Sequence, residues 1–140
     1  MIKRFLVALI AVLILNVSIC AAAELVIFHT NDMHSRVSEV DDSGQSIGLA
    51  EISAAVKSAK NNNPNTFWFD AGDTFHGMPR INISRGQNMV DLLNQSPLDA
   101  MSPGNHDYNY GDTRLIQLAK ELKATVLSAN TVTRDKHKNV

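Results

Sequence analysis

The sequence predicts an α/β fold built on parallel strands. Three observations support this prediction: short apolar runs alternate with segments of helical apolar spacing, polar loops follow the apolar runs, and the length suits one small domain or part of a larger one. Strand–helix–strand units form parallel sheets whose crossovers are nearly always right-handed. The loops that leave the strands then gather along one edge, where open α/β sheets bind their ligands.

The first 23 residues have the pattern of a signal peptide. Two basic residues precede an apolar run of 15 residues at 5–19, and small residues follow up to Ala23. Because a membrane-spanning helix needs roughly 18 or more apolar residues, we expect export rather than anchoring. Cleavage after Ala23 leaves residues 24–140 and removes Cys20, the single cysteine. Cys20 is a poor lipid-attachment site because bulky Ile19 precedes it.

The charge of the mature chain argues against a nucleic-acid polymer as partner. Loss of Lys3 and Arg4 leaves 11 basic and 14 acidic residues, a formal charge of −3. A protein that binds nucleic acid through its phosphates needs a basic face. We therefore expect a small-molecule partner, and contact with a membrane only during export.

Residues 24–70 contain two of the expected strands and one helix. The apolar run ELVIF at 24–28 precedes polar HTNDMHS, as a strand that enters a loop would. Apolar residues recur at helical spacing over 48–60. The second strand, TFWFD at 66–70, carries large apolar side chains toward both faces. Both faces then need a cover, whereas right-handed crossovers that run in one direction cover only one.

Residues 86–128 contain two further strands and two helices. Apolar spacing predicts a helix over 86–95, and LDAM at 98–101 predicts the third strand. Asp112 has the character of an N-cap for the next helix. The run ATVLS at 124–128 predicts the fourth strand.

Polar loops after the first three strands carry the residues that suggest chemistry. Asp32 and His34 are two apart, so on an extended chain they face the same way and can chelate one cation. Asp73 can bridge two metal ions about 3.5 to 4 Å apart. Asn105 offers a carbonyl oxygen that suits hard divalent cations, and His106 can act as an acid or stabilise charge.

Other polar residues of these loops have weaker signals. Asp70 ends the second strand and is expected to be a structural hydrogen-bond acceptor. His76, Asp107 and Asn109 are candidates for positions beside the substrate or behind the metal ligands. Each loop taken singly fits an ordinary turn whose side chain bonds its own backbone. Three such loops along one edge favour a shared site.

The order of these motifs resembles that of the calcineurin-like metallophosphoesterases. The segments HTNDMHSR, DAGDTFHG and MSPGNHDYNYG resemble their exported bacterial 5'-nucleotidase and 2',3'-cyclic-nucleotide phosphodiesterase branch, over almost the whole mature chain. The resemblance implies two divalent ions, with Mn, Zn, Mg, Co and Fe all open. Asp32 and His34 would bind one ion, Asn105 the other, and Asp73 both. His106 would contact the phosphate and assist the leaving oxygen.

The resemblance also implies parts that this sequence lacks. It predicts the parallel-strand half of an α/β/β/α sandwich, whereas further histidines in G-H and G-H-x-H motifs and a nucleoside-binding domain come later in such enzymes. We therefore expect residues 24–140 to be the amino-terminal part of a longer enzyme, with weak metal binding and little turnover alone. Asn109 stands where this branch often has an aspartate paired with the histidine; some relatives resembling the cyclic-nucleotide enzymes also carry asparagine there.

Several functions are compatible with these residues. The leading hypothesis is a divalent-metal-dependent hydrolase of nucleotides or related phosphate esters that acts outside the cytoplasm, in the periplasm, in the medium or at the cell surface. A second is a non-catalytic or partner-dependent metal-binding half-domain. Cyclic-nucleotide phosphodiesterase and thiosulfate-ester hydrolase activities on the same scaffold are further alternatives.

Overall fold

The computed structural model describes residues 23–40, 43–44 and 47–132. The predicted signal peptide, apart from Ala23, lies outside these residues, and so does Cys20. Within the described ranges, no helix combines the length and apolar character needed to cross a bilayer.

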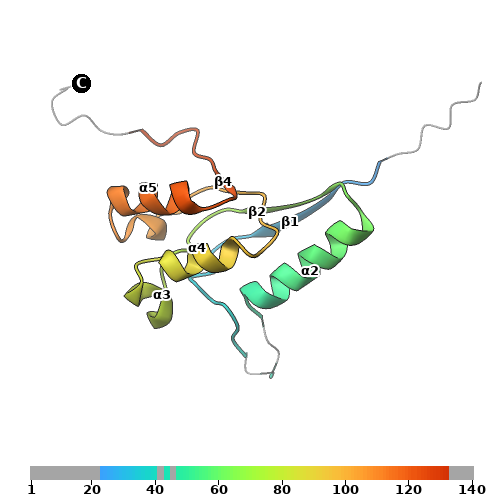
Figure 1. Ribbon diagram of the computed structural model, residues 1–140, viewed down its shortest axis with the longest axis horizontal. Coiled ribbons are helices and arrows are strands. Elements are labelled where there is room, and N and C mark those ends of the chain that lie inside the picture. The colour runs from blue at the N-terminus through green and yellow to red at the C-terminus, as the bar shows by residue number, and fades with distance from the viewer. Residues whose placement is uncertain (1–22, 41–42, 45–46, 133–140) are drawn as a thin grey trace, which may run out of the picture.

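Parallel strands form a single sheet, as the sequence predicts. The sheet has four strands in the order β1-β2-β3-β4 (Figure 1). The strands are β1 (Val26–Thr30), β2 (Thr66–Asp70), β3 (Ala100–Met101) and β4 (Thr125–Val126). All three neighbouring pairs are parallel, and β1 pairs with β2 along its whole length, from Val26 opposite Thr66 to Thr30 opposite Asp70.

The third strand is shorter than the predicted segment because a side chain replaces part of its backbone ladder. The carboxylate of Asp99 accepts the backbone N–H of Trp68 at 2.7 Å and pairs with Lys60 Nζ at 2.7 Å. The ladder between β2 and β3 therefore begins at Ala100, opposite Phe69, two residues after the start of the predicted strand.

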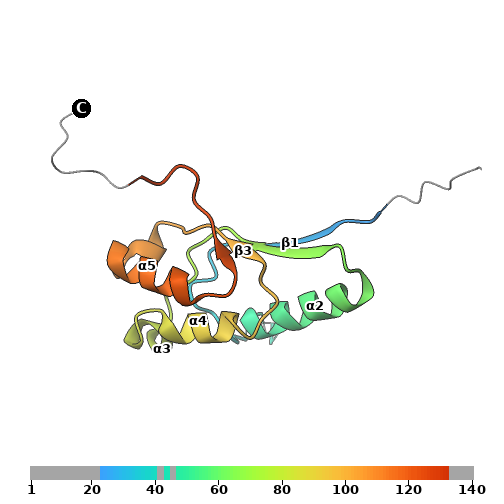
Figure 2. The same cartoon turned by 45° about the horizontal axis from the view of Figure 1, so that its top comes forward.

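The helices cover one face of the sheet, which Figure 2 shows from the side. They are α2 (Leu49–Asn62), α3 (Pro79–Ile83), α4 (Gln87–Leu93) and α5 (Asp112–Glu121), with a 3-10 turn η1 (His106–Tyr108). The sequence did not predict the short α3. Asp112 is wrong as an N-cap: Gly111 takes that position with φ 89°, a left-handed value that favours glycine, and Asp112 begins the helix.

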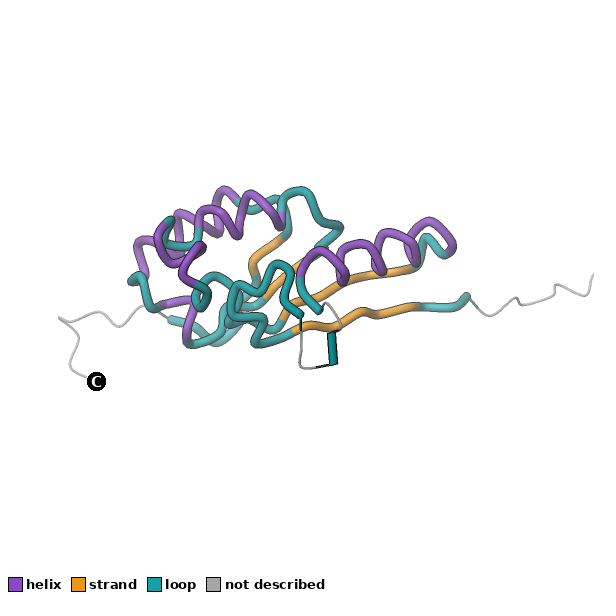
Figure 3. Tube along the Cα trace, turned by 90° about the horizontal axis from the view of Figure 1, so that it is seen from below, coloured by secondary structure: helices purple, strands orange, loops and turns teal. Residues whose placement is uncertain are grey.

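Alternate residues of β2 separate the core from the opposite face. Trp68 is completely buried under the helices, whereas Phe67 is 39% exposed and Phe69 40% exposed on the other side. The two phenylalanine rings stack there in parallel, with centroids 6.2 Å apart. Large apolar side chains are also exposed in or beside the outer strands β1 and β4: Leu25, Ile27 and Leu127. The described helices lie on the opposite side of the strands, as the sequence predicts (Figure 3).

The carboxylate of Asp70 ties the ends of β1 and β2 together. It accepts hydrogen bonds from Thr30 Oγ1 at 2.6 Å, Thr74 Oγ1 at 2.7 Å and the Gly72 N–H at 2.9 Å. Trp68 Nε1 also donates to Thr30 Oγ1 at 2.9 Å. Burial raises the pKa of Asp70, while these hydrogen bonds act in the opposite direction. The structural role predicted for Asp70 is confirmed.

Candidate metal centre

The loops after β1, β2 and β3 are joined by backbone hydrogen bonds beyond the strand ends. Asp32 N–H donates to the Gly72 carbonyl at 2.9 Å, and His34 N–H donates to the Asp73 carbonyl at 2.8 Å. On the other side of β2, Ser102 N–H donates to the Asp70 carbonyl at 2.9 Å. The loops therefore lie side by side, in the order that the strands impose.

Residues on two of these loops have left-handed backbone conformations. Their φ angles are 52° at Asp32, 45° at His34 and 59° at Asp73, in a region that residues other than glycine enter infrequently. Such conformations persist only where surrounding contacts determine them, and they concentrate at functional sites. The prediction that Asp32 and His34 lie on an extended segment is therefore wrong. The Asp32 carboxylate nevertheless lies 3.9 Å from His34 Nε2.

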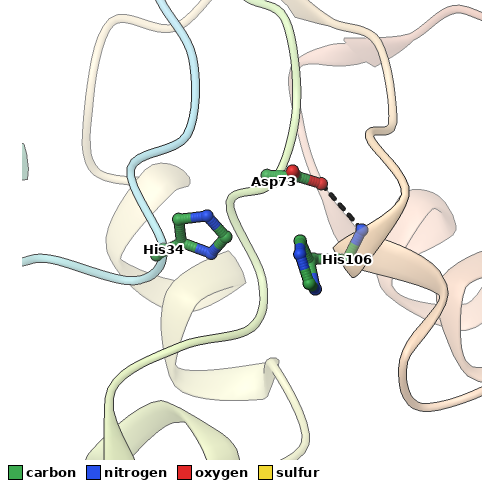
Figure 4. A group of neighbouring side chains, drawn as sticks. All are labelled: His34, Asp73 and His106. Atoms are coloured by element: carbon green, nitrogen blue, oxygen red, sulfur yellow. Dashed lines mark hydrogen bonds between the residues drawn. The ribbon is translucent and has the colours of Figure 1, made fainter.

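Side chains from three loops meet at this edge. His34, Asp73 and His106 each offer a ligand atom, and these atoms all lie within 4.8 Å of one another (Figure 4). Asp73 is buried, and both histidines are half-buried. A histidine nitrogen and a carboxylate, such as those of His34 and Asp73, are donors that divalent transition-metal ions take.

The other predicted metal ligands flank the cluster of His34, Asp73 and His106. Asp32 is exposed beside His34, and its carboxylate accepts a hydrogen bond from Asn31 Nδ2. Asn105 is exposed and directly precedes His106 in the chain. Both residues are therefore open to solvent, and the converging group does not include Asp32.

The ring of His34 is oriented as a metal-binding imidazole requires. Its Nδ1 lies 3.2 Å from the carbonyl oxygen of His76. When Nδ1 carries the proton and donates to that carbonyl, Nε2 keeps a lone pair for a cation. Histidines that bind metals usually donate their second ring N–H in this way. The orientation of His34 therefore fits a role as ligand to a divalent metal ion.

His106 occupies the centre of a group of rings. It lies edge-on to His34, with centroids 5.1 Å apart, and nearly parallel to His76, with centroids 6.0 Å apart. The side-chain nitrogen of Asn109 lies 3.0 Å from His106 Nδ1. With Asn109 as donor, the proton of the neutral imidazole resides on Nε2.

Tyr110 is a neighbour of the site that was not predicted from the sequence. Its ring lies 5.4 Å from the His76 ring, and its hydroxyl donates to Asn82 Oδ1 at 2.6 Å. Asn82 also accepts the Gly77 N–H and donates to the Gly77 carbonyl, which holds the chain next to His76. Burial raises the pKa of Tyr110, and the charge of Arg85 partly opposes the change. Only the aromatic residues of DYNYG, at 107–111, signalled this contact in the sequence.

Asp107 has no exposed surface. Its carboxylate oxygens accept backbone N–H groups from residues 73–75 and from Gly104, at 2.8 to 2.9 Å. Asp107 therefore lies behind the loops that carry the cluster, bonded to their backbone.

Comparison with known proteins identifies relatives of the described region. The family model for calcineurin-like phosphoesterases matches residues 25–135. Human 5'-nucleotidase is 36% identical over 118 residues, which cover 78% of this chain and 21% of the human protein. The chain spans about a fifth of the length of the curated relatives it matches.

Solved structures show the same similarity. A 5'-nucleotidase precursor from Thermus thermophilus has a TM-score of 0.65 and 29% identity over 76% of this chain and 22% of its own. The NAD nucleotidase of Haemophilus influenzae has a TM-score of 0.63 and 28% identity over 76% of this chain and 20% of its own. The fold of this chain is therefore similar to that of part of each protein.

Proposed function

Because the chain belongs to the calcineurin-like phosphoesterase family, we propose that it provides the first part of the metal site of a phosphoric ester hydrolase acting on nucleotides. The meeting of His34, Asp73 and His106 within 4.8 Å carries this proposal. The relatives named 5'-nucleotidase support nucleotides as the substrate class.

The proposed metal ligands divide between two divalent ions. Asp32 and His34 would hold one ion, Asn105 would hold the second and Asp73 would contribute to both. When bound, the ions supply Lewis-acid activation of water and neutralise charge on the phosphate. Two octahedral ions accept about twelve ligand bonds. Water would have to complete their coordination, so we expect weak metal binding by this chain alone.

His106 acts on the substrate in this proposal. With Asn109 donating to Nδ1, the proton on Nε2 can be donated to a phosphate oxygen or to the leaving oxygen. His34 and Asp73 lie close to this proton donor, which supports a role for it beside a phosphate held by the metal ions. His106 thus stabilises developing negative charge, and His76 keeps the ring in place by stacking on it.

The test combines metal titration with hydrolysis assays on the purified chain. We expect calorimetry to detect Mn²⁺ binding, and we expect slow Mn²⁺-dependent hydrolysis of 4-nitrophenyl phosphate and AMP that His106→Ala abolishes. His29→Ala is the matched control and should retain both properties, because His29 is exposed and lies opposite Phe69 in the strand register, on the sheet face that the described helices do not cover.

The outcomes separate the candidate functions. Absence of Mn²⁺ binding in a folded chain would refute the proposal. Binding without turnover would support the non-catalytic half-domain instead. Parallel assays with a 2',3'-cyclic nucleotide and a thiosulfate ester would reveal the other two activities.

We also propose that residues 1–23 direct export, on the basis of their charge and apolar pattern. Expression of the full chain in a bacterium should yield a processed form outside the cytoplasm. Sequencing of that form is expected to begin at Glu24. Retention of Met1 on the exported chain would contradict cleavage.

A further inference from the structure

The carboxylate of Asp107 is enclosed by the loops of the metal centre. Its Oδ1 accepts the Thr74 and Phe75 N–H groups, both at 2.8 Å. Its Oδ2 accepts the Asp73 and Gly104 N–H groups, both at 2.9 Å. Successive backbone N–H groups that converge in this way form an anion-binding concavity. Here the anion belongs to the protein itself.

The same loops are joined in the opposite direction by Asp73. Its Oδ1 accepts the His106 N–H at 2.7 Å. The loop after β2 therefore donates N–H groups to the Asp107 carboxylate, which belongs to the loop after β3. In return, the loop after β3 donates the His106 N–H to the Asp73 carboxylate, which belongs to the loop after β2. Charge-assisted bonds of this kind are shorter and stronger than neutral ones.

Close backbone approach makes the spacing of the two loops sensitive to change. A Cβ atom built on Gly104 would lie 2.3 Å from Asp73 Oδ1, and one built on Gly72 would lie 2.1 Å from the Gly104 nitrogen. Asp73 also has a φ of 59°, a conformation that needs support from its surroundings. The Asp107 carboxylate supplies that support through the N–H group of Asp73.

We infer that Asp107 is a positioning residue for the metal centre. It fixes the backbone of Asp73 and the approach of the two loops, and thereby sets the distance between the Asp73 carboxylate and His106. It acts through these residues and does not contact the substrate. The expected effect on metal affinity rests on the proposed function. The positioning of Asp73 and His106 by Asp107 rests on the loop geometry alone.

Asp107→Asn is a sharp test because it removes one acceptor without changing the shape of the side chain. The amide oxygen can still accept two N–H groups. Its NH₂ group would face the other two N–H groups, so in either orientation donors oppose donors. The loops must then separate, and Asp73 loses its support.

Asp99→Asn is the matched control. Asp99 also accepts a backbone N–H group, from Trp68 at 2.7 Å, and pairs with Lys60, but it precedes β3 instead of following it. The substitution should lower the melting temperature without altering Mn²⁺ affinity. Asp107→Asn should lower both, the affinity by about 10 to 100 fold, as loss of groups behind metal ligands does.

Calorimetry on the full chain decides between the outcomes. Wild-type affinity in folded Asp107→Asn, or an equal loss in Asp99→Asn, would overturn the inference. If Asp107→Asn does not fold, Asp107→Glu takes its place. It keeps the charge but lengthens the side chain, so it should fold with weaker Mn²⁺ binding than wild type, and unchanged affinity would overturn the inference.

A second measurement needs no metal, and it separates failure of this inference from failure of the proposed function. The amide proton of His106 donates to a carboxylate at 2.7 Å, so its NMR resonance should lie downfield. In metal-free protein, Asp107→Asn should move that resonance upfield, and Asp99→Asn should not. An unmoved resonance in folded Asp107→Asn, or Asp107→Glu in its place, would refute the inference even if wild type binds no Mn²⁺.

Discussion

The backbone N–H of His106 donates a 2.7 Å hydrogen bond to Oδ1 of Asp73 (Figure 4). This bond joins the loop that follows β2 to the loop that follows β3. It orients one carboxylate oxygen of Asp73 by means of the backbone, which is less mobile than a side chain. A displacement of either loop would therefore change the position of both groups.

Asp73→Asn separates the charge of this carboxylate from its hydrogen bond. The amide oxygen can still accept the His106 N–H, so we expect the chain to fold. The negative charge shared between the proposed metal ions is lost, and Mn²⁺ affinity should fall by more than the roughly 10 to 100 fold seen for groups behind the ligands. Titration calorimetry measures the change. Asp91→Asn on α4 is the control, and equal affinities in the two variants would contradict the assigned role.

Asn109→Asp should reverse the tautomer of His106. In the wild type, Asn109 donates to Nδ1 and leaves the proton of the neutral ring on Nε2. A carboxylate can only accept, so in the variant Nδ1 must carry the proton. Two-dimensional ¹⁵N–¹H correlation spectra of the imidazole nitrogens distinguish the tautomers. The His76 ring serves as the internal control, and an unchanged His106 pattern in the variant would show that Asn109 is not the donor.

The strands and helices could be predicted because apolar patterning reflects burial, and right-handed crossovers that run in one direction imply the sequential strand order. The alternation of exposed Phe67, buried Trp68 and exposed Phe69 follows from the period of a strand. The boundaries depend on longer-range contacts. Asp99 shortens β3 by accepting the Trp68 N–H, a bond across 31 sequence positions that no local pattern reveals.

The convergence of the candidate site could be predicted from the sequence, but the backbone conformation of its loops could not. Parallel strands in sequential order bring the loops of His34, Asp73 and His106 together, so their convergence follows from topology. The left-handed backbone of His34 and Asp73 depends on hydrogen bonds between loops, and sequence spacing does not encode it. The burial of Asp107 was hidden for the same reason, because three of its four donors precede it by 32 to 34 positions.

The sheet face that the described helices leave uncovered, which carries Phe67 and Phe69, should promote dye binding and aggregation. Phe67→Thr and Phe69→Thr together replace exposed rings with residues that favour strands, so the free energy of unfolding should change little. Binding of the dye ANS and aggregation on concentration should both decrease. Trp68→Ala is the contrasting variant: it empties the core beneath the helices and should cost about 3 to 5 kcal/mol. Undiminished dye binding in the double variant would show that the apolar surface lies elsewhere.

Asp70 should make the chain less stable as the pH rises through the acidic range. Burial raises the pKa of this carboxyl above its ordinary value of 3.8, so between those two values the unfolded chain releases the proton more readily than the folded chain does. The contribution of Asp70 to stability is therefore fully present below pH 3.8 and is lost as the pH passes the raised pKa. Asp70→Asn cannot titrate, so the stability of wild type relative to this variant should decline across that window. Urea unfolding at a series of pH values measures the difference, from which the other carboxyl groups cancel.

A second variant tests the cause of this pH dependence. Thr74 Oγ1 donates to Asp70 at 2.7 Å, and this hydrogen bond lowers the pKa of Asp70 against the effect of burial. Thr74→Val has the same shape but no donor, so the pKa should rise further and the decline in stability should extend to higher pH. Parallel stability profiles for wild type, Asp70→Asn and Thr74→Val would mean that Asp70 does not titrate differently on folding. The network that joins β1 to β2 would then be held by groups other than this carboxyl.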